Sequence, residues 1–278
     1  MIILICSDKY QLDKAFLFSN KLLSLGIRCV MDEECAVGDV PPGVDFLKRD
    51  ACDEICDMIV SVGGDGTMLK VSQRAVKLNK PVFGLNAGRI GFLCAFDYED
   101  VGSITREDIE SLVLNERMLL EVVLDQQPEN KYLAVNDMVL NKGGASKTIE
   151  LKVFGGGNLI GDYRADGVIV STPTGSTGYS LSAGGPIVDP SLDVVLVTPV
   201  CPHTMFARSI AFGGEESIRI EPSGRNDTDV YLSVDSSYTF LLEEHSGVTV
   251  KKSEETLKLL TSNKRSYFEM LSKRVRGI

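Results

Sequence analysis

Short apolar runs alternate with longer amphipathic segments over the first part of the chain. The apolar runs are 2–6, 27–31, 57–62 and 81–85, and each has the length of a buried strand. Between them, helical periodicity predicts helices over 11–25, 44–56 and 67–78, and the glycines and prolines of 32–43 indicate a loop. Strands that alternate with helices predict a parallel sheet, so we expect residues 1–100 to form an α/β domain.

The pattern changes after a polar, acidic segment at 97–108, which we interpret as a linker. The strands expected beyond it are 119–125, 132–140, 148–154, 168–171, 194–198, 230–234 and 248–251. No long helical pattern intervenes, so residues 101–261 are expected to form an all-β domain of two sheets. The basic tail, 262–278, has one apolar side and is predicted to form a helix that packs back on the α/β domain.

Composition and charge narrow the possible partners. With 29 Lys and Arg against 39 Asp and Glu, the formal charge of the 278-residue chain is −10, which disfavours binding to nucleic acid or an anionic membrane. The N-terminus has no basic leader, and no run approaches the ~18 apolar residues of a membrane span. The 7 cysteines are scattered, and Cys52 and Cys56 lack zinc-knuckle spacing. We therefore expect a cytoplasmic protein with reduced thiols.

The stretch Gly63–Thr67, which reads Gly-Gly-Asp-Gly-Thr, lies where a predicted strand ends and a helix begins. Ligands bind at this position in open α/β sheets. Its spacing matches neither the P-loop nor the dinucleotide fingerprint. The glycines could belong to an ordinary Asp-Gly turn, but their number at one β–α junction favours a binding loop. A carboxylate, Asp65, is an unexpected choice for a loop that meets phosphates.

A polar pair, Asn136 and Asp137, interrupts the apolar run 134–140. Buried polar side chains need hydrogen bonds. An Asn can donate and accept together, which suits an adenine edge or a ribose hydroxyl. A turn or bulge at a strand end would explain the pair equally well.

The longest polar stretch is 161–186. Within it, residues 171–182 carry eight hydroxyl side chains and two glycines around one proline. Small residues of this kind let a flat ligand lie against the backbone, although a loop rich in Ser and Thr can also serve solubility alone. His203, one of two histidines, has no acid, Cys or Ser at the spacing of a triad or metal site. We therefore assign it no chemistry.

Together these stretches resemble the NAD kinase family. The shared pattern comprises the Gly63–Thr67 loop, Gly-x-Asn-x-Gly-x-x-Gly-Phe at 84–92, the Asn136–Asp137 pair, Asp-Gly-x-x-x-Ser-Thr-Pro-Thr-Gly-Ser-Thr-x-Tyr-Ser from Asp166, and Thr-Pro-x-Cys-Pro-His at 198–203. The order is that of the family, from about residue 57 to the C-terminal tail. The first loop alone also occurs in lipid kinases and phosphofructokinases, whereas the stretch 166–182 is more specific.

The resemblance implies an enzyme that transfers a phosphoryl group from ATP, or from another phosphate donor, to the 2′-hydroxyl of the adenosine ribose of NAD, with Mg²⁺ or another divalent cation. It also implies an N-terminal α/β domain and a C-terminal all-β domain, with the site between them. In this interpretation Asp65 faces the reacting ribose, and Gly66 allows close approach. Asp65 then meets a neutral hydroxyl, and a carboxylate of ordinary pKa, about 4, can accept its proton or help to hold Mg²⁺.

The remaining site residues are also implied by the resemblance. Asn136 and Asp137 would hold the dinucleotide. Thr177, Gly178, Tyr179 and Ser182 would line the adenine and ribose sites, and Lys70, Lys147, Arg164 and Asp166 match positions that flank the dinucleotide or the phosphates. Phe92 and Asp235 are the further cofactor-binding residues. Three residues depart from the family pattern, which usually has Glu at Asp137, Ala at Gly178 and Gly at Ser236. These departures bear on substrate preference and not on the reaction.

Two other functions share part of the evidence. A lipid kinase of the diacylglycerol type would carry the first loop, but it needs an apolar substrate groove and not the stretch 166–182. A non-catalytic dinucleotide-binding regulator is disfavoured by the intact Asp65. The family resemblance further implies a homodimer or homotetramer.

Overall fold

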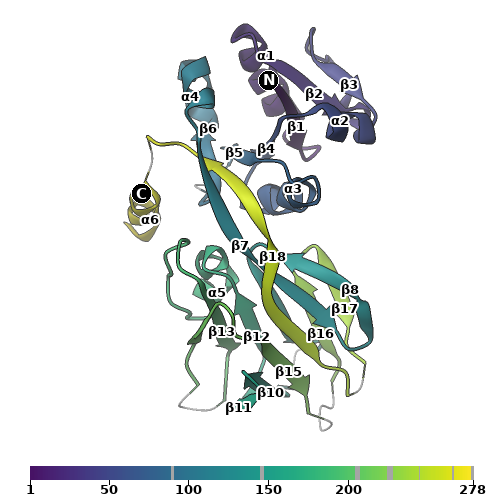
Figure 1. Cartoon of the computed structure of the whole chain (residues 1–278), viewed down its shortest axis with the longest axis vertical. Coiled ribbons are helices and arrows are strands. Elements are labelled where there is room, and N and C mark those ends of the chain that lie inside the picture. Colours follow the sequence, from purple (N-terminus) through teal and green to yellow (C-terminus); the bar gives the residue numbers. More distant parts are fainter. Residues whose placement is uncertain are drawn as a thin grey trace. The chain divides into compact units, whose positions relative to one another are not determined.

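The chain forms two compact units in the computed structural model, which describes residues 1–88, 91–144, 147–203, 207–223, 228–243, 245–264 and 266–276. One unit comprises 1–116 with 257–278, and the other comprises 117–256. The chain leaves the first unit within strand β7 (Val113–Leu124) and returns within β18 (Val248–Thr261) (Figure 1). The sequence pattern put these boundaries at 100 and 261, whereas both strands extend beyond the apolar runs that predicted them.

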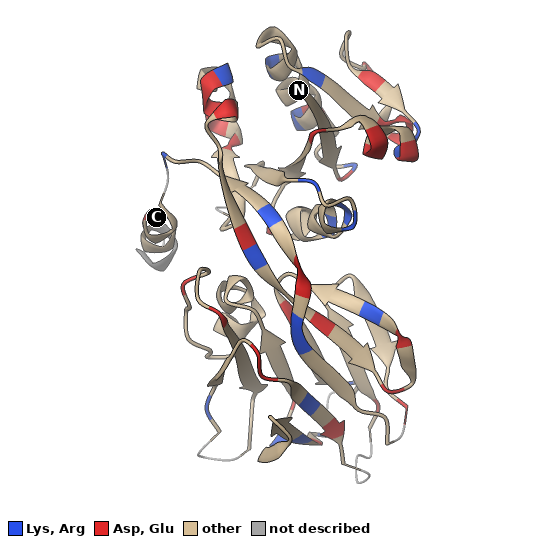
Figure 2. Cartoon of the chain, viewed as in Figure 1, with Lys and Arg blue, Asp and Glu red and all other residues tan. Residues whose placement is uncertain are grey.

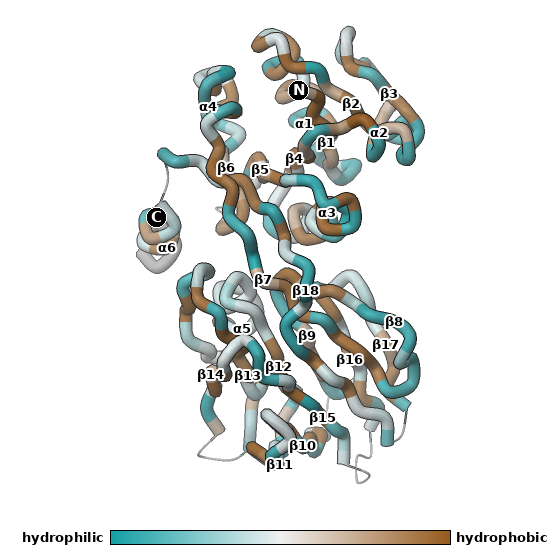
Figure 3. Tube along the Cα trace, in the orientation of Figure 1, coloured by the Kyte–Doolittle hydropathy of each residue, from teal (hydrophilic) through white to brown (hydrophobic). Residues whose placement is uncertain are grey.

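The first unit is built on a parallel sheet in the order β6-β5-β4-β1-β2-β3. Its strands are β1 (Ile2–Ser7), β2 (Arg28–Asp32), β3 (Asp45–Leu47), β4 (Met58–Gly63), β5 (Val82–Asn86) and β6 (Cys94–Asp97). The hydropathy colouring of Figure 3 shows that the neighbouring strands β1, β4 and β5 are mostly apolar. The predicted parallel α/β architecture is therefore confirmed.

Helices and 3-10 turns connect these strands. They are α1 (Leu12–Ser24), η1 (Glu33–Cys35), α2 (Arg49–Ile55), α3 (Asp65–Lys77), η2 (Tyr98–Ser103), α4 (Arg106–Glu110) and the C-terminal α6 (Tyr267–Arg276). Helix α1 buries Phe18 and Leu22 in the core of the unit, where Phe18 meets Phe83 edge to face. Acidic residues are frequent in α2 and α4 (Figure 2).

Two sequence predictions for this unit were wrong. A single helix over 44–56 was expected, but residues 45–47 form β3, which pairs with β2, and α2 begins only at Arg49. The segment 97–108 is no linker, because Val101 and Ile104 are buried there and Thr105 begins α4 with a capping box. The sequence pattern did not indicate these two buried side chains, because most of the other residues of the segment are polar.

The second unit contains two antiparallel arrays, as the two-sheet prediction required. One sheet runs β14-β13-β12-β9-β16-β17, and the other contains β11-β10-β15-β18 with the β7–β8 hairpin. The strands not yet defined are β8 (Gln127–Ala134), β9 (Asp137–Lys142), β10 (Ile149–Gly155), β11 (Asn158–Ala165), β12 (Gly167–Ser171), β13 (Val194–Val200), β14 (Ile210–Gly213), β15 (Ile218–Pro222), β16 (Val230–Val234) and β17 (Tyr238–Leu241). Between β12 and β13 lie η3 (Thr174–Thr177) and α5 (Tyr179–Ser182).

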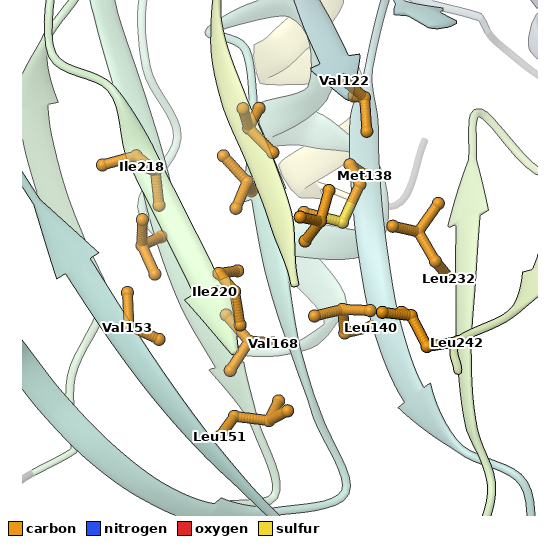
Figure 4. Packing of buried hydrophobic residues seen from close by; sticks show 14 of the residues in the cluster. Val122, Met138, Leu140, Leu151, Val153, Val168, Ile218, Ile220, Leu232 and Leu242 are labelled. Atoms are coloured by element: carbon orange, nitrogen blue, oxygen red, sulfur yellow. The ribbon is translucent and has the colours of Figure 1, made fainter. Parts of the chain in front are cut away.

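The core of the second unit lies between these arrays. Leu140, Val168 and Leu232 of the six-stranded sheet belong to the same buried cluster as Leu151 and Ile220 of the other array (Figure 4). Each such side chain contributes about 1.5–3 kcal/mol when fully buried. The sequence missed four strands of this unit, β11, β14, β15 and β17, and it took the end of β8 and most of β9 for one strand, 132–140. Three of the missed strands are sheet edges, which lack a continuous apolar pattern.

Candidate functional site

Asp65 is the first residue of α3, two residues earlier than the predicted start of this helix. Its carboxylate lies against the segment that follows β5. The backbone N–H of Phe92 donates to Asp65 Oδ2 at 3.3 Å, and a Cβ on Gly91 would come within 2.4 Å of Oδ1. The carboxylate is therefore fixed at the start of the helix, while the residue itself stays half-buried.

The carboxyl ends of β1, β4 and β5 meet beside this aspartate, because the three strands are parallel neighbours. Thr67 Oγ1 donates to Asp8 at 3.0 Å, which ties α3 to the end of β1. The N–H of Ala87 donates to the Gly63 carbonyl at 3.0 Å, which ties the end of β5 to the same loop. A Cβ on Gly63 would lie 2.5 Å from Thr67 Oγ1, so the loop has no room for a side chain there.

The other predicted residues of this unit have different surroundings. Gly66 and Lys70 are exposed on α3. Phe92 is buried, and its ring lies 6.1 Å from that of Tyr267, so the C-terminal helix α6 contacts the segment that holds Asp65. Arg89 and Ile90, which belong to the motif 84–92, lie outside the described residues.

In the second unit, Asn136 and Asp137 form a corner between β8 and β9. The Asp235 carboxylate, which follows β16, accepts hydrogen bonds from the N–H groups of Val135 at 2.7 Å, Asn136 at 2.8 Å and Asp137 at 3.1 Å. In return, the N–H of Asp235 donates to the Asp137 carbonyl at 3.0 Å. One carboxylate thus holds three consecutive peptide groups.

The opposite side of the same corner is held by Thr172. Its N–H donates to the Asn136 carbonyl at 2.9 Å, and its hydroxyl donates to the Val135 carbonyl at 2.7 Å. The Thr172 hydroxyl also accepts from the Gly175 N–H at 2.9 Å. Gly175 packs so closely that a Cβ there would come within 2.1 Å of the Asn136 carbonyl oxygen.

The side chains of the corner approach Gly178. A Cβ on Gly178 would lie 3.5 Å from Asn136 Nδ2 and 3.8 Å from Asp137 Oδ2. Burial raises the pKa of Asp137 to about 7, and the nearby Asp235 carboxylate adds to this shift. The corner therefore presents an amide and a carboxyl group that titrates near neutrality.

The hydroxyl-rich stretch continues this cluster. Thr177 is half-buried, whereas Tyr179 and Ser182 are exposed at α5, with 42% of Tyr179 accessible. The structure thus brings seven predicted residues to one end of β9, β12 and β16. They are Asn136, Asp137, Thr177, Gly178, Tyr179, Ser182 and Asp235.

Three other predicted residues of this unit lie elsewhere. Asp166 precedes β12 and pairs with Lys142 Nζ at 2.7 Å, at the opposite end of β9 from Asp137. Five steps of extended strand correspond to about 17 Å. Arg164 lies in β11, where its Nε donates to Thr148 at 3.1 Å, and Lys147 is exposed just before β10. Within one chain, Asp166 is therefore separated from the corner.

Sequence reasoning named no role for Gly91, Thr172 or Gly175. All three stand inside stretches that it had quoted, at 84–92 and 166–182. Their roles are backbone contacts, and a sequence pattern alone does not say which peptide groups they meet.

Comparison with known proteins shows which family this chain resembles. A model described as the ATP-NAD kinase N-terminal domain matches residues 44–112, and one described as the ATP-NAD kinase C-terminal domain matches 135–262. An NAD kinase of Symbiobacterium thermophilum is 41% identical over 224 residues, which is 80% of this chain and 79% of the relative. An NAD kinase of Clostridium perfringens is 34% identical over 263 residues, covering 92% and 93%.

The chain belongs to the NAD kinase family. Solved structures agree with this assignment. A yeast NADH kinase crystallised with NADH superposes with a TM-score of 0.84 at 25% identity, over 99% of this chain and 87% of that one. An NAD kinase from Archaeoglobus fulgidus in complex with ATP shares the fold, with a TM-score of 0.77 at 24% identity over the whole of both chains. The alternative of a lipid kinase is not supported by these matches.

The structure also explains two departures from the NAD kinase pattern. A methyl group on Gly178 would lie 3.2 Å from the Gly175 carbonyl oxygen, so the usual Ala fits with a small shift. Ser236 adopts a left-handed φ of 55° beside Asp235 at 46°, and the Ser237 N–H closes this turn on the Val234 carbonyl at 2.9 Å. A left-handed backbone conformation costs a residue with a side chain about 1–2 kcal/mol of stability. Glycine at position 236 would avoid this cost, and Ser236 does not.

Proposed function

We propose that this chain transfers the γ-phosphoryl group of ATP to the 2′-hydroxyl of the adenosine ribose of NAD, giving NADP and ADP. The main support for the proposal is the position of Asp65 and the orientation of its carboxylate. Asp65 stands at the start of α3 and at the carboxyl end of β4, with its carboxylate oriented by the Phe92 N–H. A carboxylate in this position suits a reaction in which a neutral hydroxyl must lose a proton.

In the proposed step the ribose O2′ forms a bond to the γ-phosphorus while the bond to the ADP oxygen breaks. Asp65 orients the hydroxyl and accepts its proton. A ribose hydroxyl is too weak an acid to ionise beforehand, so the proton moves late in a loose transition state. The close packing of Gly91 against Oδ1 supports a fixed orientation of the base.

The start of α3 is suited to the phosphates of the donor. In a helix the first N–H groups, here including those of Gly66 and Thr67, have no partner within the helix and attract anions. Mg²⁺ is commonly held by one or two carboxylates together with substrate phosphates, and Asp65 provides one such oxygen donor. The cation would neutralise donor charge, which an acidic protein of net charge −10 requires.

The second unit supplies the residues proposed to bind the dinucleotide. The Asn136 amide and the Asp137 carboxyl group are held beside Gly178, and Tyr179 is exposed next to them. An exposed tyrosine ring offers a flat apolar surface with a polar tip, which suits a base or nicotinamide ring. Roles for Lys70, Lys147, Arg164 and Asp166 stay predictions from the family resemblance.

The test is the formation of NADP from NAD and ATP with Mg²⁺ by the purified chain, followed with an NADP-specific dehydrogenase. We expect NADP and ADP to appear in equal amounts. NADH in place of NAD tests acceptor preference, and diacylglycerol tests the lipid-kinase alternative. Phosphorylation of diacylglycerol without any NADP, or NAD binding without turnover, would contradict the proposal.

We also propose a cytoplasmic homodimer or homotetramer. None of the 7 cysteines forms a disulfide, which supports a reducing compartment. Leu159 and Ile160 are exposed on the edge strand β11, which supports association between copies. Among the described residues no helix is long and apolar enough to cross a membrane. Light scattering on the purified chain tests the assembly, and a monomer mass at micromolar concentration would contradict it.

A further inference from the structure

The corner at Val135–Asp137 has an unusual hydrogen-bonding pattern. It lies where β8 has ended and β9 begins, so strand pairing does not hold all of its peptide groups. The three N–H groups of the corner instead donate to one side chain, Asp235. The carbonyls of Val135 and Asn136 accept from Thr172, and that of Asp137 accepts from the Asp235 N–H.

Every N–H of the corner has a partner, and every carbonyl accepts one hydrogen bond. No backbone donor is left for a ligand, so we expect the donors of this corner to come from its side chains, with the Asn136 amide first among them. Asp235 is only 5% exposed, and both of its carboxylate oxygens accept bonds from the corner. Bonds between a carboxylate and N–H groups are among the stronger hydrogen bonds in proteins. The Asp235 side chain is therefore a buried, hydrogen-bonded part of the corner.

We propose that Asp235 is a positioning residue, which holds the Val135–Asp137 backbone so that the Asn136 and Asp137 side chains are set for the dinucleotide before it binds. The ligand's identity rests on the function proposed above, and the positioning role does not. The family resemblance had placed Asp235 among the binding residues themselves. Preorganisation of this kind lowers the ordering cost of binding.

The first test is Asp235→Asn. An amide keeps one acceptor oxygen but turns an NH₂ group toward the N–H groups of the corner, so the corner loses its fixed conformation. We expect NAD affinity, measured by isothermal titration, to fall at least tenfold, while the KM for ATP changes less than about twofold. Unchanged NAD affinity in a folded Asp235→Asn protein would overturn the proposal.

Asp125→Asn is the matched control. Asp125 belongs to the same unit, accepts a bond from the Gly247 N–H at 2.9 Å and pairs with Arg219 at 2.7 Å, away from the corner. Its substitution should lower the melting temperature without changing NAD affinity. An equal loss of NAD affinity in both variants would show a general structural effect and would overturn the proposal.

A double-mutant cycle separates positioning from direct contact. If Asp235 acts through the corner, Asp235→Asn should weaken NAD binding less than about threefold once Asn136→Ala is present. If the losses of NAD affinity in the two single variants multiply in the double variant, Asp235 contacts NAD independently of Asn136, and the proposal is overturned. If Asp235→Asn does not fold, Thr172→Val takes its place in the cycle, with Thr172→Ser as the variant that keeps the hydroxyl and should retain affinity. A wild-type chain that binds NAD but makes no NADP would contradict the proposed function alone.

Discussion

Asp137 is a buried acid whose nearest charged neighbour in the corner is another acid, Asp235. With 8% and 5% of their surfaces exposed, both side chains are largely removed from water. The pKa of Asp137 rises to about 7, first through burial and then through repulsion from Asp235. The native carboxyl group therefore holds its proton more tightly than the unfolded chain, in which the pKa is near 3.8.

This shift predicts a pH dependence of stability. The contribution of Asp137 is fully present below about pH 4, declines as the pH rises toward 7 and is lost above it. Asp137→Asn removes the titration. We expect the free energy of unfolding of this variant, relative to wild type, to rise by about 2 kcal/mol between pH 5 and pH 8. Denaturant titrations without ligand measure it, and a difference that stays constant over this range would contradict the assignment.

Gly91 has a role that only its contacts reveal. A Cβ at this position would lie 2.4 Å from Asp65 Oδ1, which is closer than real contacts allow, so Gly91→Ala must move the carboxylate. Displacement of a catalytic group by about 1 Å can cost about a hundredfold in rate. We expect kcat to fall ten- to a hundredfold in steady-state assays, with the KM for NAD changed less than about twofold.

The control for this substitution is Gly102→Ala. Gly102 is an exposed glycine of the same unit, and a Cβ there meets nothing within 4 Å. Its activity should match wild type. Equal kcat values for Gly91→Ala and wild type would show that the carboxylate does not depend on this contact.

At the scale of elements, helix α3 is anchored by one buried cation. Arg74, 8% exposed, pairs with Asp32 at 2.6 Å and with Asp53 at 2.6 Å, so α3 is tied to the end of β2 and to α2. Burial by itself lowers the pKa of Arg74, but the hydrogen-bonded carboxylates of Asp32 and Asp53 outweigh this effect and raise the pKa above its usual value. Because α3 carries Asp65 at its start, this network also sets the direction of the helix that bears the proposed base.

Arg74→Met is expected to destabilise the protein by about 3 kcal/mol, because it leaves two partly buried carboxylates without their cation. Chemical denaturation measures this difference. The same change at Arg106, whose pair with Glu110 is 52% exposed on both sides, should cost less than about 1 kcal/mol. Similar losses in the free energy of unfolding for the two variants would mean that burial of the Arg74 network does not increase its contribution to stability.

The elements that the sequence predicted well are those with a full apolar face. Strand β4 and helix α1 lie within two residues of their predicted ends. Strand β3 was missed because its three residues are anchored by pairing with β2 and not by a pattern of their own. The segment 97–108 looked like a linker because two buried side chains, Val101 and Ile104, hold an otherwise polar stretch.

The candidate site was predictable to a similar extent. Motif resemblance singled out Asp65, Asn136 and Asp137, and their roles in binding and catalysis stay predictions. The three-way bond of Asp235 and the packing of Gly91 could not be predicted, since both are backbone contacts between segments far apart in sequence. Only the fold determines which peptide groups such residues meet.

At the scale of the whole molecule, the proposed chemistry is divided between the two units. Asp65 and the start of α3 belong to the unit formed by 1–116 and 257–278, whereas the Asn136–Asp137 corner belongs to 117–256. The residues proposed for proton transfer and for dinucleotide binding therefore belong to separately packed cores. It follows that substitution should be able to remove turnover without removing binding.

Asp65→Asn tests this account most directly. The amide has nearly the shape of the carboxylate but cannot accept the proton of the ribose hydroxyl. Steady-state kinetics with ATP and Mg²⁺ measure kcat, and calorimetric titration measures NAD affinity on the same protein. The account predicts that kcat falls by at least about a hundredfold, while NAD affinity stays within about threefold of wild type. A folded Asp65→Asn enzyme that keeps near-wild-type turnover would contradict it.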